Sequence, residues 1–361
     1  MIAPRSGAPL ILTSTVGGDT TRPGRGVAPR LDYLELARVT GGRVVHPLTA
    51  RGPLAALEAR LRRFGDWRQG WRAMRSDACA FVSLSEKAAL APALLDRARP
   101  HVAVAHNLTT PRRRQLQERT GWLSRLDRIV VLTTPQARYL CEEVGLPRER
   151  VRVVRDHVDD RFFEPSGRAP ERFVLSVGQT RRDYPTLLEA VAALDAPTTV
   201  VASSLWTGRA PELRDGDRGV SVRAGISARE LRHLYDRASV VVVPLEAGLD
   251  FAAGVNAVLE AMSMARPLVV TATPGIADYV EDGVNCLLVP AGEPRALLSA
   301  IERLLDDRRL AERLGAAGRA VIERERTLDA YVAALVAIMD EVTAASTCPP
   351  APRRRRPSRA G

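Results

Sequence analysis

Twelve short apolar runs, most of them rich in valine, alternate with longer segments of helical periodicity along this chain. Such alternation predicts parallel βαβ units with strands buried on both faces, and therefore an α/β fold. In the first half we expect strands at Leu10–Thr13, Arg43–His46, Cys79–Leu84, His101–Ala105, Arg128–Leu132 and Val151–Val154. In the second half we expect them at Phe173–Val177, Thr198–Ala202, Val220–Arg223, Val240–Val243, Leu268–Thr271 and Cys286–Val289.

A proline- and glycine-containing break falls at Phe162–Glu171, and 361 residues suit two domains of ordinary size. We expect one Rossmann-like domain at residues 1–165 and a second at 166–330. Amphipathic helices are expected at Arg295–Leu305 and Thr327–Val342, the second giving a C-terminal helix at 331–345. Residues 346–361 are rich in proline and arginine, so we expect this tail to be disordered.

The composition excludes several classes of protein. The net charge is +11, but Lys87 is the only lysine and five positive charges lie in the tail. Aromatic residues make up 4% of the chain, too few for an interleaved nucleic-acid platform, so no specific nucleic-acid partner is expected. The four scattered cysteines favour neither a zinc site nor disulfides and suit a reducing cytoplasm. No apolar run is long enough to span a membrane.

The segment Val240–Gly275 carries the most chemical information. A buried strand is followed by a loop, and a helix is expected to begin near Gly254 and Val255. A glycine at a helix N-terminus lets backbone amides approach an anion, which the helix dipole also favours. A diphosphate would fit there, with Asn256 and Glu260 on an adjacent helix face and Glu260 accepting hydrogen bonds from ribose. The alternative is an ordinary helix glutamate that points into water.

Several blocks of sequence in the second half occur in a familiar order. They are Phe173–Ala190 (FVLSVGQTRRDYPTLLEA), Leu231–Pro244 (LRHLYDRASVVVVP), Glu260–Pro267 (EAMSMARP) with Leu268–Gly275 and Val280–Gly283, and Gly315–Arg319 (GAAGR). Together they resemble the C-terminal domain of the retaining glycosyltransferases of family 4. That resemblance implies the GT-B fold, with two Rossmann-like domains facing a central cleft. It also implies transfer of a sugar from a nucleoside diphosphate sugar, with retention and with neither a cofactor nor a metal.

The family has two glutamates in this region, and only one of them is present in this chain. The second glutamate falls at Glu260, which implies ribose binding, whereas the first falls at Ala252, which cannot bind a hydroxyl. Asp250 and Glu246 in the same loop are possible substitutes. Backbone amides at Gly254 would still supply a diphosphate site.

The family's cationic pair follows the first strand of this domain, at the turn that contains Gly178. The lysine position corresponds to Arg182, which keeps the charge and suits phosphate binding. The arginine position corresponds to Gln179, and Arg181 is a candidate replacement. Arg182 is therefore assigned both to donor binding and to catalysis. If Arg181 does not replace the missing arginine, it is a surface charge.

The first half is more divergent. Thr15–Gly18 (TVGG) resembles the family's glycine-rich turn, so Gly17 and Gly18 are assigned to donor binding. His106 follows a buried strand, where ligands of open α/β sheets collect, and is assigned to catalysis against the donor sugar. A structural histidine is the alternative. Val151–Phe163 resembles the interdomain segment.

Two questions stay open at the level of sequence. The first is the acceptor, which is a glycan, a lipid-linked group or a small molecule. The second is whether the chain is an active enzyme or a non-catalytic subunit that scaffolds a partner transferase. An apolar stripe with flanking arginines suggests peripheral binding to an anionic membrane, with help from Arg353–Arg356. The stripe consists of Leu54, Leu57, Leu61 and Phe64, is flanked by Arg60, Arg62 and Arg63, and is continued by Trp67 and Trp71. The alternative is a helix packed on the N-terminal sheet.

Overall fold

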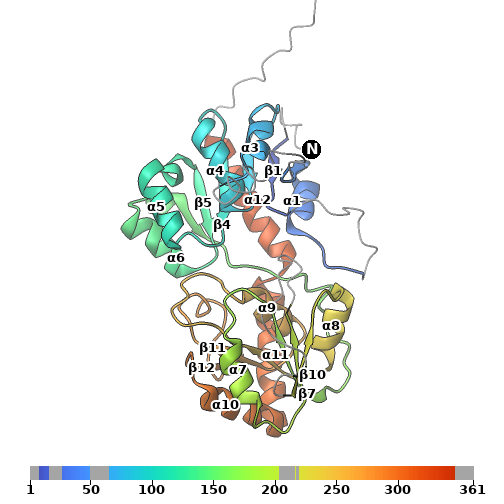
Figure 1. Ribbon diagram of the computed structural model, residues 1–361. Helices are drawn as coiled ribbons and strands as arrows, with labels where there is room; N and C mark the ends of the chain where they lie inside the picture. Colours follow the sequence, from blue (N-terminus) through green and yellow to red (C-terminus); the bar gives the residue numbers. More distant parts are fainter. Residues whose placement is uncertain (1–7, 16–26, 49–64, 203–215, 217–218, 346–361) are drawn as a thin grey trace, which may run out of the picture.

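The computed structural model describes residues 8–15, 27–48, 65–202, 216 and 219–345. In that part of the chain, a strand lies at each of the twelve expected positions. The N-terminal sheet has the order β2-β1-β3-β4-β5-β6 and the C-terminal sheet the order β12-β11-β10-β7-β8-β9, both fully parallel. The prediction of an α/β fold built from two Rossmann-like domains is therefore confirmed. Figure 1 shows the two domains one above the other.

The N-terminal sheet is made of short strands whose side chains are largely buried. Its strands are β1 (Leu10–Leu12), β2 (Arg43–Val45), β3 (Phe81–Ser83), β4 (His101–Ala105), β5 (Arg128–Val131) and β6 (Val151–Val153). Its helices are α1 (Asp32–Thr40), α3 (Trp67–Met74), α4 (Glu86–Leu95), α5 (Pro111–Thr120) and α6 (Thr134–Arg138). One-turn 3-10 segments lie at Trp122–Arg125 and Arg148–Arg150, and a π-helical turn at Tyr139–Glu143.

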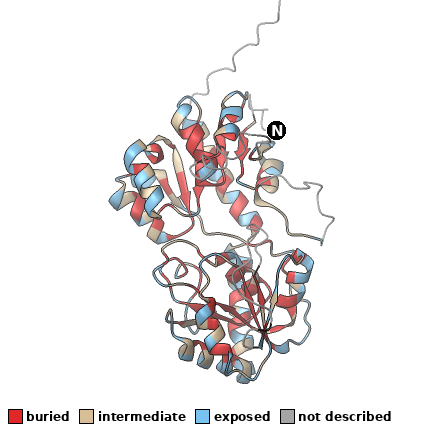
Figure 2. Cartoon of the chain, in the orientation of Figure 1, coloured by how far each residue is buried: buried red, intermediate tan, exposed pale blue. Residues whose placement is uncertain are grey.

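The C-terminal sheet contains longer strands and is buried at its centre, as Figure 2 shows. Its strands are β7 (Glu171–Val177), β8 (Thr198–Val201), β9 (Val220–Arg223), β10 (Ala238–Val243), β11 (Leu268–Thr271) and β12 (Leu287–Val289). Its helices are α7 (Tyr184–Val191), α8 (Ala228–Arg237), α9 (Val255–Ser263), α10 (Pro294–Asp306) and α11 (Arg308–Glu325).

Two glycines of the GAAGR block allow α11 to pack closely on α9. A Cβ at Gly315 would lie 2.3 Å from the carbonyl oxygen of Ala265, and one at Gly318 would lie 3.1 Å from Cγ of Met262. No side chain fits at the first position without moving backbone. The block therefore fixes the helix that carries Glu260 against the rest of the domain.

The last helix, α12 (Leu328–Ala345), returns to the N-terminal domain. Its buried residues Tyr331, Leu335 and Met339 share one core with Ile11 and Val104 of the N-terminal sheet. In Figure 1 this orange-red helix lies among the elements of the first part of the chain. The chain thus crosses between the domains twice, after β6 and before α12.

The first crossing ends before the break expected at Phe162–Glu171. Phe162 and Phe163 are buried in the core of the C-terminal domain, and strand β7 already begins at Glu171. Their large apolar side chains outweigh the turn-forming residues that follow, because burying two phenylalanines removes much apolar surface from water.

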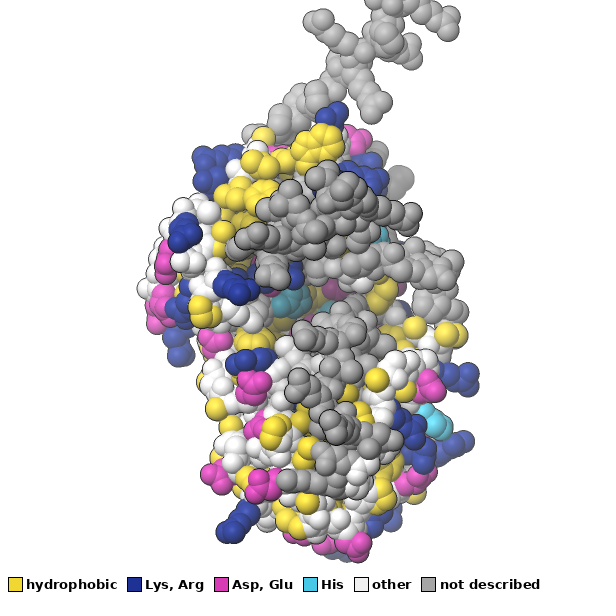
Figure 3. All heavy atoms as spheres, viewed as in Figure 1, with side chains coloured by type: hydrophobic (Ala, Val, Ile, Leu, Met, Phe, Trp, Pro, Cys, Tyr) yellow, Lys and Arg dark blue, Asp and Glu magenta, His cyan; other side chains and the backbone are white. Residues whose placement is uncertain are grey.

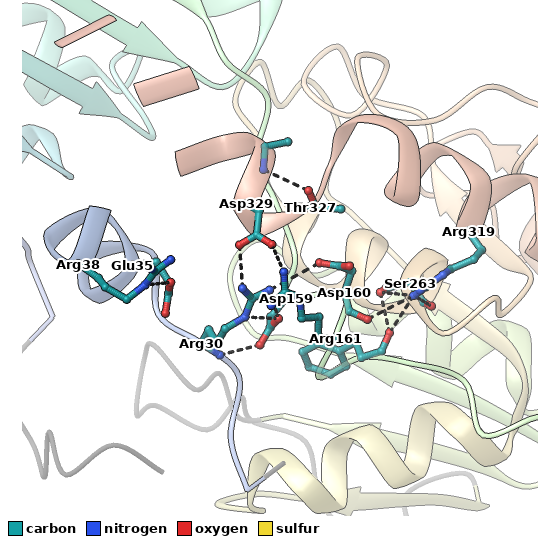
Figure 4. A network of polar contacts seen from close by, with 12 residues as sticks. Arg30, Glu35, Arg38, Asp159, Asp160, Arg161, Ser263, Arg319, Thr327 and Asp329 are labelled. Atoms are coloured by element: carbon teal, nitrogen blue, oxygen red, sulfur yellow. Dashed lines mark hydrogen bonds and ion pairs between the residues drawn. The ribbon is translucent and has the colours of Figure 1, made fainter. Parts of the chain in front are cut away.

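A network of charges joins the two crossings to the N-terminal domain (Figure 4). Arg30 donates through Nη2 and Nε to Asp159, at 2.7 and 2.9 Å, and through Nη1 to Asp329 at 2.8 Å. The crossings themselves bond to one another, since the Val158 amide donates to the Arg326 carbonyl at 3.0 Å. Arg30 therefore ties together three segments that are far apart in the sequence.

Candidate donor-binding site

Arg182 lies under the turn that follows β7. Its Nε and Nη2 donate to the carbonyl of Val177, at 3.1 and 2.9 Å, and its Nη1 donates to the carbonyl of Thr180 at 3.0 Å. Gly178 adopts a φ of 116°, and a Cβ there would lie 2.2 Å from Nη2, so this turn requires glycine. Among the described residues no carboxylate lies within ion-pair distance of Arg182. Burial lowers its pKa, yet a guanidinium stays charged at neutral pH.

The N-terminus of α9 lies beside this cation. Gly254 is the N-cap, with a φ of 80° and no capping side chain, and a Cβ on it would lie 3.2 Å from Nη1 of Arg182. The amides of Asn256 and Ala257 donate to no acceptor among the described residues. Two amides without an acceptor, the positive end of the helix dipole and a guanidinium with no direct ion pair therefore meet here within the described residues. This arrangement is suited to an anion.

Glu260 lies one turn further along α9, where it is partly buried and hydrogen-bonded. The hydroxyl of Tyr235, a buried residue of α8, donates to its Oε2 at 2.8 Å. Burial raises the pKa of Glu260 to about 7, against the smaller opposing effects of the Tyr235 hydrogen bond and the charge of Arg182. No described residue donates to Oε1. The reading of Glu260 as a solvated helix residue is therefore wrong, and one carboxylate oxygen remains for a ligand.

Gln179 and Arg181 have partners other than Arg182. The Gln179 amide donates to the carbonyl of Ala202 at the end of β8. Arg181 has a left-handed φ of 57° and pairs with Glu246 at 3.0 Å, with both side chains well exposed. In this structure neither side chain adds a second cation beside α9.

The loop between β10 and α9 is fastened to the N-terminal domain. Asp250 accepts a hydrogen bond from the Thr109 hydroxyl at 2.7 Å through Oδ1, and its carbonyl accepts one from Thr133 at 3.0 Å. Ala252 packs against the apolar cores of both domains. Asp250 therefore has one carboxylate oxygen engaged between the domains, and Ala252 has a packing role.

His106 follows β4 directly and has an exposed side chain. Its amide donates to Glu86 at 3.0 Å, and the Gln136 amide donates to its carbonyl at 2.9 Å. Its Nε2 lies 3.1 Å from the carbonyl of Leu84, which can only accept. We therefore assign the neutral ring as the Nε2–H tautomer, which leaves Nδ1 as an acceptor.

Hydrogen bonds between the domains hold the loops after β4 and β5 against the C-terminal domain. The Tyr279 hydroxyl donates to the Leu132 carbonyl at 2.8 Å and accepts from the Asp156 amide at 3.0 Å. The carboxyl ends of both sheets face this junction, where ligands of open α/β sheets bind. Figure 3 shows the surface hollowed between the two domains. Gly17 and Gly18 lie outside the described residues.

The described residues contain no cluster of three or more potential metal-ligating side chains. No helix among them is both long and apolar enough to span a bilayer. Cys141 and Cys286 are free thiols.

The sequence missed Tyr235 and Tyr184 as parts of the site. Tyr184 donates from its hydroxyl to the Gly178 carbonyl and so holds the turn above Arg182. Both tyrosines occupy apolar positions of helices, where the sequence indicates only core packing. The available signal was their position inside the blocks Leu231–Pro244 and Phe173–Ala190.

Comparison with known proteins agrees with this fold. Residues 171–307 match the family model of glycosyl transferases group 1, so the chain carries a glycosyltransferase domain of that group. D-inositol 3-phosphate glycosyltransferase of Geodermatophilus obscurus is 30% identical over 252 residues, which are 61% of this chain and 54% of that protein. The chain thus spans about half the length of this curated relative.

Solved structures of similar fold cover nearly the whole chain. Sucrose-phosphate synthase of Thermosynechococcus elongatus aligns with a TM-score of 0.73 at 18% identity, over 94% of this chain and 100% of that one. HepE of Anabaena, solved with UDP-glucose, aligns with a TM-score of 0.70 at 14% identity, over 92% and 100%. At these identities the likeness establishes the fold, which is GT-B.

Proposed function

We propose that this protein transfers a sugar from a nucleoside diphosphate sugar to an acceptor hydroxyl. The observation that carries the proposal is the Arg182 guanidinium beside the uncapped N-terminus of α9, with no carboxylate in ion-pair distance among the described residues. The diphosphate gains negative charge as the glycosidic bond breaks. A fixed cation and free backbone amides stabilise that charge without having to reorganise.

Glu260 binds the donor ribose in this proposal. Its Oε2 is held by Tyr235, which orients the carboxylate and leaves Oε1 to accept hydrogen bonds from the ribose hydroxyls. His106 faces the donor sugar from the N-terminal domain, with Nδ1 accepting a hydrogen bond from a sugar hydroxyl. Retention at the anomeric carbon belongs to the proposal through the resemblance to family 4.

A thermal-shift panel of UDP, GDP, ADP and TDP tests the donor site. The nucleotide of the true donor stabilises the protein by mass action, by about 2.7 kcal/mol at a concentration one hundred times its Kd. UDP is the first candidate, because HepE is solved with UDP-glucose. If no nucleotide raises the melting temperature, or if Arg182→Ala responds as strongly as the wild type, the donor site is wrongly assigned.

The rival function is a non-catalytic subunit with the same fold. It is favoured by Ala252, which packs between the domains where the family has a glutamate, and by Gln179, which bonds to Ala202. Incubating the purified chain with the preferred sugar nucleotide separates the two. Release of nucleoside diphosphate that Arg182→Ala abolishes supports the enzyme, whereas tight binding without any turnover supports the subunit.

We further propose that the acceptor is reached at an anionic membrane surface. Helix α3 exposes Trp71, whose ring lies 4.6 Å from the Arg75 guanidinium, and Arg72 lies beside it. The sequence predicts Trp67 on the same membrane-binding surface, but Trp67 packs against the N-terminal core instead. The stripe at residues 54–64 and the tail lie outside the described residues.

Sedimentation with vesicles tests the membrane proposal. Salt-sensitive binding to vesicles of anionic lipid that falls in Trp71→Ala supports it. Protein that stays in the supernatant at low salt contradicts it and points to an acceptor free in solution.

A further inference from the structure

A small basic pocket lies on the outer side of the C-terminal domain, away from the cleft. It is formed between α8 and the segment that leads into β7, and its volume is about 240 Å³. Figure 3 shows Lys/Arg and His colouring together on the side of the lower domain where Figure 1 places α8. The pocket is lined by Ser166, Arg168, Arg229, Arg232, His233 and Asp236.

The spacing of residues on α8 explains why basic groups gather there. Arg229, Arg232, His233 and Asp236 follow one another at helical intervals and therefore share one face. The opposite face of the helix is buried through Leu231, Leu234 and Tyr235. A capping box between Ser227 and Glu230 fixes the start of the helix, so the pocket face is presented by a well-defined element.

The arginines of this pocket outnumber its carboxylates. Among the described residues, no carboxylate lies within ion-pair distance of Arg168, Arg229 or Arg232, whereas Arg237 at the end of the same helix pairs with Glu171 at 2.5 Å. Arg232 donates only to the carbonyl of Glu164, at 3.3 Å. Three guanidinium groups therefore line the pocket without a direct ion pair among the described residues, and the one carboxylate of the lining, Asp236, acts on Arg232 through its charge.

The single carboxylate in the lining is already engaged. Asp236 accepts hydrogen bonds from the amide and the hydroxyl of Ser166, at 3.0 and 2.5 Å, and its Oδ1 lies 3.8 Å from Nη2 of Arg266. These contacts hold the 166–168 segment against α8 and offset the negative charge. Asp236 shapes the pocket and leaves it with a net positive charge, since one carboxylate stands against three arginines.

The size of the pocket limits what can enter. A volume of about 240 Å³ is below the roughly 300–1,000 Å³ typical of sites for whole small molecules, but it admits a single phosphoryl group. Arginine is the residue best suited to such a group, because its planar fork donates two parallel hydrogen bonds. We propose that Arg168, Arg229, Arg232 and His233 form a second anion site, which binds a terminal phosphate group.

The second site is separate from the donor site. Arg182 and the N-terminus of α9 contribute nothing to its lining, and Tyr235, which reaches Glu260, lies on the other face of α8. Both sites can therefore be filled at once. The phosphate belongs either to a soluble phosphorylated molecule or to a lipid headgroup, and both offer the same chemistry to the arginines.

Titration with inorganic phosphate, followed through the imidazole resonance of His233, tests the proposal. The full-length Arg182→Ala protein serves as background, so that the donor site does not contribute, and His233→Gln assigns the resonance. Phosphate should shift that resonance, more strongly than chloride at equal ionic strength. In the Arg229→Gln/Arg232→Gln variant its affinity should fall at least about tenfold, because two charge-assisted donors are lost.

Arg309→Gln is the matched control, since it removes an exposed charge from α11, away from the pocket. An unmoved His233 resonance overturns the proposal. An equal loss of affinity in the control also overturns it, because the effect is then one of net charge. Sedimentation with phosphatidate vesicles distinguishes the sources: binding lost in the double variant identifies a lipid headgroup, and binding of phosphate alone identifies a soluble molecule.

Discussion

Replacing Glu260 with glutamine should change how the stability of the protein depends on pH. Burial raises the pKa of Glu260 to about 7, whereas in the unfolded chain the group titrates near 4.5. Between about pH 4.5 and pH 7, the folded state therefore keeps a proton on Glu260 that the unfolded chain has released. The stability linked to this proton is fully present below about pH 4.5 and is lost as the pH rises to about 7, with a magnitude on the order of 3 kcal/mol.

The Glu260→Gln side chain keeps an oxygen that accepts a hydrogen bond from the Tyr235 hydroxyl, but this side chain cannot ionise. Relative to the wild type, the variant should therefore gain about 3 kcal/mol of stability between pH 4.5 and pH 8. Calorimetric melting temperatures at matched ionic strength should show the difference, at about 2–4 °C for each kcal/mol. Glu302→Gln, at an exposed position of α10, is the control and should show no such trend.

The same variant tests the ribose assignment. Ribose hydroxyls donate hydrogen bonds and therefore favour the ionised carboxylate, so nucleotide binding to the wild type near pH 6 should release a proton. Calorimetry in buffers of different ionisation enthalpy measures this release, which Glu260→Gln should abolish while weakening binding. A constant stability difference between the two proteins at all pH values would refute the argument from burial.

Three further predictions follow from the site and the crossings. Arg182→Ala should weaken nucleoside diphosphate binding by about 1.5–3 kcal/mol in titration calorimetry, the range for a charge-assisted hydrogen bond, and unchanged affinity in a folded variant rules the contact out. Gly254→Ala should lower the melting temperature and weaken binding, since its Cβ would meet Leu245 and Val243 at 3.0 Å on a left-handed backbone; normal binding would show that the α9 N-terminus is not the diphosphate site. Arg30→Gln should cost about 2–3 kcal/mol in denaturation, because it leaves the buried Asp159 without its partner, and a loss below about 0.5 kcal/mol would show that the network contributes little.

The sequence predicts the elements of the fold well because each strand is a local apolar run. The start of α9 was also predictable, since the apolar periodicity and Gly254 mark it within a few residues. The environment of Glu260 was not, because Tyr235 approaches it from another helix, 25 residues away along the chain. The packing of α12 depends on a partner more than two hundred residues distant, which no local pattern specifies.

The return of α12 to the N-terminal sheet has a consequence for synthesis on the ribosome. The C-terminal domain is continuous from β7 to α11 and can complete its core once α11 has emerged. The first domain to be translated is the last to be finished, because Tyr331, Leu335 and Met339 cover apolar side chains of its sheet. Until α12 is released, that face of the nascent chain is open to chaperones and to aggregation.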